Sequence, residues 1–73
     1  MKTVFTYGGN NPYNPTAAAM IELRQSEDKN GLFILTYGCE VTPRLTYARA
    51  CSAVGAAILH HLACDSIVNN QGK

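Results

Sequence analysis

The feature that most constrains the fold is a β-hairpin signal at Asn30-Gly31, which lies between two segments of strand-like sequence. Asn and Gly both accept the positive φ angles that tight hairpin turns require. Before the turn, residues 17–25 read AAAMIELRQ, in which apolar and polar side chains alternate as in a half-buried strand. After it, residues 32–39 read LFILTYGC and supply the returning strand. The sequence therefore predicts an antiparallel pair joined by residues 26–31.

The register of this hairpin decides which side chains face the core. With an even number of residues in the turn, Leu32, Ile34 and Thr36 share a face with Ile21 and Leu23, and that face is expected to carry a helix. The opposite face is then largely apolar and uncovered, which usually marks an interface. We expect this second face to hold Met20, Glu22, Arg24, Phe33, Leu35 and Tyr37.

One long helix is predicted from Thr42-Pro43 to about Cys64. Thr can cap a helix, and Pro suits its first position. Almost no side of this helix is polar, so we expect it to be buried on two sides. A helix of this length also spans more than a short strand does, so it is expected to overhang its own sheet. The predicted sheet-facing stripe consists of Leu45, Ala48, Ser52, Gly55, Leu59 and Leu62.

The remaining segments complete one domain that covers residues 1–73. Residues 2–7 read KTVFTY and predict a strand, and residues 8–16 read GGNNPYNPT and predict a flexible loop. The tail, residues 69–73, is expected to fray. The predicted fold class is α+β, with a three-stranded antiparallel sheet packed against one C-terminal helix in the order β-β-β-α.

Composition limits the partners and the compartment. The net charge is +1 and only 15% of residues are charged, so the chain attracts phosphate backbones and anionic membranes weakly. The three cysteines cannot all pair within one chain, which favours reduced thiols. No leader-like or membrane-spanning apolar run is present in the sequence. We expect a cytoplasmic protein that neither enters a membrane nor binds nucleic acid directly.

Two groups of residues could carry chemistry, and neither is complete. His60 and Cys64 are spaced so that two ligands could reach one ion, but a structural zinc site needs four ligands. His60 and His61 also fit the last turns of a helix, where a cation complements the helix dipole. Cys39 beside Glu40 could act as a thiol nucleophile, but nothing places a histidine next to it. We therefore expect no metal, no cofactor and no catalytic residue.

Binding is better supported than catalysis. The loop 8–16 combines glycines, amide side chains and an aromatic ring, as recognition loops do, and it is longer than a hairpin needs. Its Asn10, Asn11 and Tyr13 therefore join the six residues of the second sheet face as predicted partner-binding residues. Because both that face and the helix lack cover within the chain, the sequence favours a homodimer or a tight hetero-complex over a lone monomer.

Residues 17–65 resemble two groups of small proteins in their layout of hairpin, short loop and Ala-rich helix, from IELRQSEDKNG to VGAAILHHLA. One group is the small phage-encoded anti-CRISPR proteins, and the other is the antitoxins of HicB type. The resemblance is one of layout, so no functional residue of either group is carried over. The acidic surface of the DNA-mimicking anti-CRISPR proteins is absent from this sequence, and TPRLTYARA replaces the acidic helix start of the antitoxins.

Together these features predict a non-enzymatic, anti-CRISPR-like inhibitor. It is expected to act in the cytoplasm of the phage's host and to occlude a surface of a larger host protein or protein–nucleic acid complex. The alternative is a small dimeric regulatory or nucleic-acid-binding module of the antitoxin kind, whose binding would weaken steeply with added salt. A third hypothesis, a metal-dependent or thiol enzyme, would require bound zinc or a reactive thiol.

Overall fold

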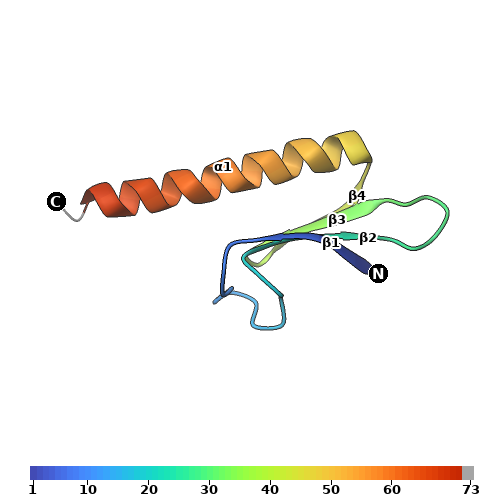
Figure 1. Ribbon diagram of the computed structural model, residues 1–73, viewed down its shortest axis with the longest axis horizontal. Coiled ribbons are helices and arrows are strands. Elements are labelled where there is room, and N and C mark those ends of the chain that lie inside the picture. Colours follow the sequence, from blue (N-terminus) through green and yellow to red (C-terminus); the bar gives the residue numbers. More distant parts are fainter. Residues whose placement is uncertain (72–73) are drawn as a thin grey trace.

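The structure, a computed structural model, describes the backbone of residues 1–71 and the side chains of residues 1–64. One antiparallel sheet, ordered β1-β2-β3-β4, carries a single C-terminal helix on one face (Figure 1). The α+β class, the antiparallel sheet and the C-terminal helix are confirmed, but the sheet has four strands instead of three. The elements are β1 Lys2–Tyr7, β2 Ile21–Gln25, β3 Phe33–Tyr37, β4 Glu40–Leu45 and α1 Tyr47–Gln71.

The fourth strand occupies residues in which the sequence predicts the start of the helix, so that prediction is wrong. Pro43 fits β4 because β4 is an edge strand, where a missing amide hydrogen need not break a ladder bond. The strand is also irregular. Arg44 has a φ of 60°, and the register with β3 shifts near that residue. Pro43 therefore marks a bulged edge and not a first helical turn.

The helix begins one short segment later, with Thr46 as its cap. The N–H of Arg49 donates to Thr46 Oγ1 at 3.3 Å, and the N–H of Ala50 donates to the Thr46 carbonyl at 2.8 Å. The helix also continues to Gln71, past the predicted end near Cys64. Of the tail predicted to fray, residues 72–73 lie outside the described residues.

The overhang of α1 is as expected. A helix of 25 residues is about 37 Å long, and its C-terminal part runs past the end of the sheet (Figure 1). The molecule measures 51 × 25 × 15 Å with a radius of gyration of 13.4 Å. A compact chain of this length would have a radius of gyration of about 11 Å. Much of the helix therefore lies beyond its own sheet.

The hairpin turn has an odd number of residues, which reverses the predicted faces. Residues 26–32 join β2 to β3, and the N–H of Ser26 donates to the Leu32 carbonyl at 2.8 Å. In this register Ile21 pairs with Tyr37, Leu23 with Leu35, and Gln25 with Phe33. Side chains of paired residues lie on one face. Phe33, Leu35 and Tyr37 therefore face the helix, and the prediction that they form an uncovered second face is wrong.

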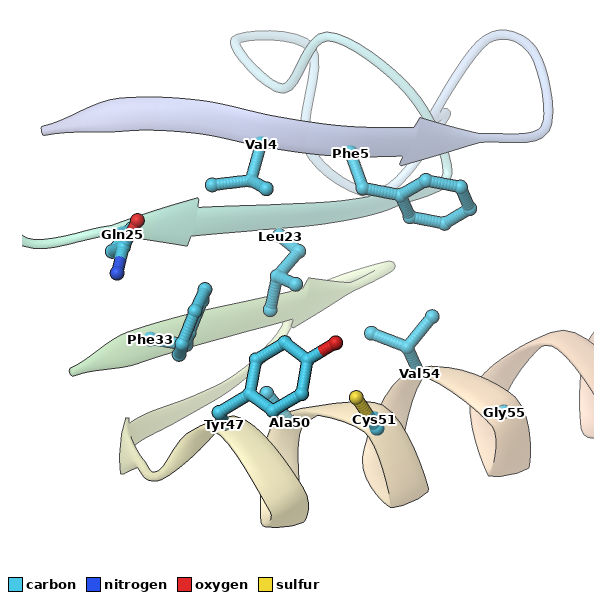
Figure 2. Close-up of a pocket in the computed structure, with 10 residues that line it drawn as sticks. All are labelled: Val4, Phe5, Leu23, Gln25, Phe33, Tyr47, Ala50, Cys51, Val54 and Gly55. Carbon is cyan, nitrogen blue, oxygen red and sulfur yellow. The ribbon is translucent and has the colours of Figure 1, made fainter. Parts of the chain in front are cut away.

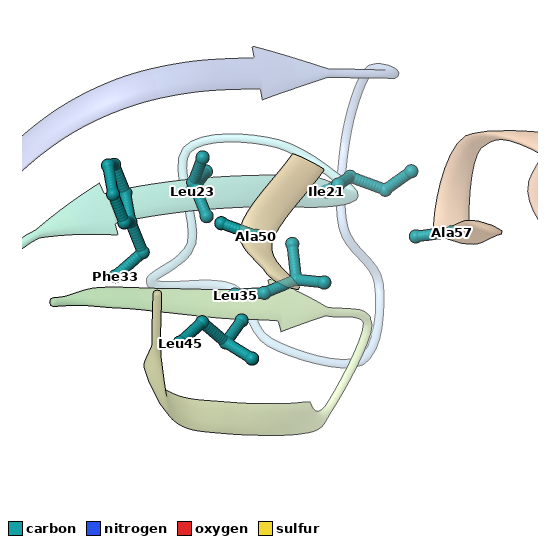
Figure 3. Close-up of a cluster of buried hydrophobic side chains, with 7 residues drawn as sticks. All are labelled: Ile21, Leu23, Phe33, Leu35, Leu45, Ala50 and Ala57. Atoms are coloured by element: carbon teal, nitrogen blue, oxygen red, sulfur yellow. The ribbon is translucent and has the colours of Figure 1, made fainter. Parts of the chain in front are cut away.

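The core lies between this sheet face and α1 (Figure 3). Ile21 is the one large side chain described that is fully buried. Two helical alanines, Ala50 and Ala57, point at the sheet, and their small size lets the helix lie close to the strands. The buried cluster consists of Ile21, Leu23, Phe33, Leu35, Leu45, Ala50 and Ala57.

The helix is rotated from the predicted orientation. Its predicted sheet-facing stripe includes Leu59 and Leu62, but these side chains are 69% and 45% exposed. Leu45 is buried as predicted, although it belongs to β4. The apolar pattern could not determine the rotation because nearly every side of this helix is apolar.

The sheet face away from the helix is partly polar. Glu22 and Arg24 lie there and form an ion pair, with 3.5 Å between Glu22 Oε1 and Arg24 Nε. Thr36 is buried between strands, opposite Glu22 in the register. The predicted grouping of Glu22 and Arg24 with Phe33 and Leu35 is therefore wrong, because the two pairs lie on opposite faces.

We expect Ile21→Val to lower the free energy of unfolding by about 1 kcal/mol, because it removes a fully buried methylene. Val41→Ala removes more atoms from an exposed β4 position and should change stability by less than about 0.5 kcal/mol. Urea denaturation of both variants at one protein concentration checks this. Equal losses would contradict the assignment of the core.

The turn also predicts a pH effect. Asp28 Oδ1 accepts the N–H groups of Asn30 at 2.9 Å and Gly31 at 3.2 Å. The Ser26 hydroxyl, followed by the Gly31 N–H, lowers the pKa of Asp28 below its ordinary 3.8. Because the folded pKa is the lower one, its stabilisation is present above the unfolded pKa and is lost as pH falls through the folded pKa. An NMR titration of the Asp28 carboxyl carbon should show a midpoint below 3.8; a midpoint at or above that value would contradict this turn geometry.

Candidate partner-binding site

The connection between β1 and β2, residues 8–20, is organised by one buried amide side chain. Asn11 is 2% exposed. Its Nδ2 donates to the carbonyls of Gly38 at 3.0 Å and Ala19 at 3.5 Å. Its Oδ1 accepts the N–H groups of Tyr13 at 3.0 Å and Asn14 at 3.2 Å. Such local bonds to the backbone are what Asn supplies in turns, and here they also tie the loop to the β3–β4 turn.

Two further backbone bonds hold the end of the loop. The N–H of Met20 donates to the Gly9 carbonyl at 3.0 Å, and the N–H of Gly38 donates to the Met20 carbonyl at 2.9 Å. Ala17–Met20 therefore belong to the loop, and β2 begins at Ile21 and not at residue 17 as predicted. Gly38 has a φ of +62°, and a Cβ there would meet Tyr13 and Met20 at 3.6 Å. Any larger residue at position 38 would strain this turn.

These contacts build a shallow hollow of about 240 Å³ at the loop end of the sheet, which we call the loop-end hollow. Tyr13, Met20 and Tyr37, all predicted partner-binding residues, come together there. Tyr13 is 67% exposed. The complete lining is Tyr13, Met20, Tyr37, Gly38, Cys39, Glu40 and His60.

The other predicted partner-binding residues lie elsewhere. Asn11 is buried within the loop, and Asn10 is exposed outside the lining of the hollow. Phe33 and Leu35 belong to the core. Glu22 and Arg24 lie on the far sheet face, as described above. The partner-binding role of all these residues stays a prediction, but Phe33 and Leu35 do not share an uncovered face with Glu22 and Arg24.

Sequence reasoning missed His60, Cys39 and Glu40 as parts of this surface. Cys39 lies in the turn before β4, and Glu40 is the first residue of β4, the strand that was not predicted. His60 reaches the hollow because its ring and the Tyr37 hydroxyl share a hydrogen bond, with 3.0 Å between the hydroxyl oxygen and Nδ1. No spacing in the sequence links residues 37 and 60, because the contact depends on the rotation of α1.

The two histidines of α1 contact aromatic rings and a cysteine. His61 packs edge-on against Tyr7 and Tyr37, with ring centroids 6.3 Å apart in both pairs. Cys64 Sγ lies 3.9 Å from both ring nitrogens of His60, so it sits beside the ring without pointing at one nitrogen. Within residues 1–64, no group of three His, Cys, Asp or Glu side chains is placed to hold a metal ion.

A second and larger concavity lies between β1 and the first turns of α1 (Figure 2). We call it the α1–β1 groove. Its volume is about 650 Å³ and its lining is almost entirely apolar. In Figure 2, Val4 and Phe5 on β1 stand across from Tyr47 and Val54 on α1. The full lining is Val4, Phe5, Leu23, Gln25, Phe33, Tyr47, Ala50, Cys51, Val54 and Gly55.

Comparisons of this chain with family models, curated proteins and solved structures find no match. In the part of the chain that the structure describes, no helix combines the length and apolar character needed to cross a membrane.

We expect Asn11→Ala to lower the free energy of unfolding by about 1–3 kcal/mol, because it leaves buried backbone groups without partners. Amide hydrogen exchange at Tyr13 and Asn14 should accelerate by at least tenfold. The matched control is Asn10→Ala, the same change at the exposed neighbour, which should alter neither quantity. Unchanged exchange in the Asn11 variant would show that this side chain does not order the loop.

Proposed function

We propose that the protein is a non-catalytic binding protein that engages a partner protein through the loop-end hollow. The observation that carries this proposal is the Asn11 anchor. A buried amide with four polar contacts holds a loop whose outermost aromatic ring, Tyr13, remains mostly exposed. This loop is ordered well beyond what a simple connection between two strands requires.

A rigid loop that presents an aromatic ring is well suited to binding. The ordering of a flexible loop is a main cost of association, and a loop ordered in advance avoids it. Tyrosine combines a large apolar surface with a polar hydroxyl and is enriched among residues that dominate binding energy. Met20 and Gly38 supply an apolar floor beside Tyr13, while Glu40 and His60 supply polar groups at the edge.

The same surface supports thiol catalysis poorly. Cys39 and His60 both line the hollow, but no hydrogen bond joins them among the described residues. His60 Nδ1 already shares a hydrogen bond with Tyr37. A thiol nucleophile needs a base held within hydrogen-bond reach, so this arrangement favours binding.

We propose a larger host protein or protein–nucleic acid complex, such as a CRISPR effector, whose working surface the chain would occlude. The support is the resemblance of the sequence to small anti-CRISPR proteins in its hairpin followed by an Ala-rich helix, together with a low net charge of +1 that favours protein over nucleic acid as the partner.

We expect Tyr13→Ala to weaken partner binding about 30-fold, the effect of losing one dominant contact, while the circular dichroism spectrum stays unchanged. Immobilised wild-type protein, Tyr13→Ala and Val41→Ala are exposed to the same host lysate, and retained proteins are quantified by mass spectrometry. The Val41 control lies on an exposed strand outside the hollow.

A protein retained by the wild type and Val41→Ala but lost with Tyr13→Ala supports the proposal, and calorimetry with that purified partner then gives the affinities. Equal retention by all three proteins would overturn it, as would no specific retention. Retention of nucleic acid that disappears with added salt would instead favour the regulatory module.

A further inference from the structure

The α1–β1 groove continues into an apolar stripe along the same side of the helix. Tyr47, Cys51 and Gly55 line the groove. Their spacing of four residues continues to Leu59, and Leu62 follows one turn later on the same side. Leu59 is 69% exposed and Leu62 is 45% exposed, and the helix overhangs its sheet in this direction (Figure 1). One stripe therefore holds a cavity at one end and projecting leucines at the other.

Gly55 lies at the centre of this stripe, and no contact among the described residues requires a glycine there. It lies inside α1, and a Cβ added there would meet nothing within 4 Å. Glycine in a helix interior is less favourable than alanine, because it loses more backbone freedom on folding. Because glycine has no Cβ, it allows another chain to approach this side of the helix closely.

The edges of the sheet are poor sites for an added strand. β1 has a bulge between Thr3 and Phe5. β4 contains Pro43, and Arg44 next to it has a positive φ angle, in the left-handed region. Bulges and proline at edges discourage pairing with another strand. An occupant of the α1–β1 groove is therefore expected to pack as a helix, through side chains.

We propose that the occupant is a second copy of this chain, and that the two α1 helices pair antiparallel about Gly55. In this arrangement Leu59 of each copy lies beside Cys51 of the other, and Leu62 lies beside Tyr47 at the mouth of the groove. Each copy supplies both the cavity and the leucines that fill it, so the interface is self-complementary, as a twofold dimer requires.

The groove and the stripe supply more than half of the surface that a standard dimer interface needs. A standard interface covers about 800 Å² on each partner, roughly a sixth of the 5147 Å² surface of this chain. The exposed parts of the five large side chains at the groove and stripe amount to about 500 Å², and the small residues between them extend the contact. These five side chains are Val4, Phe5, Tyr47, Leu59 and Leu62.

The proposed dimer leaves the loop-end hollow open. Successive helical residues are about 100° apart, which places His60 on the side of α1 opposite Cys51. His60 belongs to the hollow and Cys51 to the groove. Dimerisation and partner binding therefore use different sides of the helix, and either could fail without the other.

Sedimentation equilibrium of the full chain tests the proposal. The wild type is expected to be a dimer at micromolar concentration. Leu59→Glu should weaken association at least 100-fold, because it places a charge in an apolar interface. The matched control is Val41→Glu, the same kind of change at an exposed apolar residue on the far sheet face, and it should remain dimeric.

Gly55→Leu tests the close approach separately, and it is expected to weaken the dimer while the helix content is kept. If Leu59→Glu or Gly55→Leu fails to fold, the wild type alone provides the test. Its melting temperature must rise with protein concentration if folding and dimerisation are coupled. Isotope-filtered NOEs between mixed copies should join the Leu59 methyls to the Cys51 β-protons. A wild type that stays monomeric at 500 µM, on the order of a weak dimer's dissociation constant, overturns the proposal, as does a dimer that lacks these NOEs.

Discussion

The whole architecture depends on the number of residues in one turn. Because residues 26–32 are odd in number and are closed by the Ser26–Leu32 bond, Phe33 and Leu35 share a face with Ile21 and Leu23. One residue more or fewer would move every side chain of β3 to the other face. The apolar groups of both strands are thereby gathered on one side of the sheet, which is where α1 packs. The far face is left partly polar, with the Glu22–Arg24 pair.

β1, the β2–β3 hairpin and the presence of a C-terminal helix could be read from the sequence, but β4 and the orientation of the helix could not. Alternation and turn residues predict the hairpin, and β-branched and aromatic residues predict β1 correctly. Pro43 is ambiguous because proline suits both a first helical turn and an edge strand. Asn30-Gly31 indicates a turn but does not determine how many residues the turn contains. The rotation of α1 is likewise undetermined, because a helix that is apolar on nearly every side has no single preferred face.

The candidate site was also only partly predictable, because local composition indicates a loop but not its long-range contacts. The composition of the loop 8–16 indicated recognition, and Tyr13 indeed lies exposed at a hollow. What could not be predicted is that Asn11 would be buried while Asn10 is exposed, because the two neighbours have the same chemistry. His60 was weighed as a metal ligand, yet its ring is paired with Tyr37. Long-range contacts of this kind depend on β4 and on the rotation of α1, two features that the sequence patterns predicted wrongly.

The bond between Asn11 and Gly38 joins residues 27 positions apart, which has a consequence for the order of folding. Contacts between distant residues form only after the intervening chain has been brought together, and that closure costs entropy. Here the intervening chain contains the β2–β3 hairpin. We therefore expect the hydrogen bond from Asn11 to Gly38 to form only after the hairpin has formed. For this reason we expect the loop-end hollow to form late on the folding pathway. In the native state it is also expected to open locally before the sheet does, in sub-global fluctuations that leave the core intact.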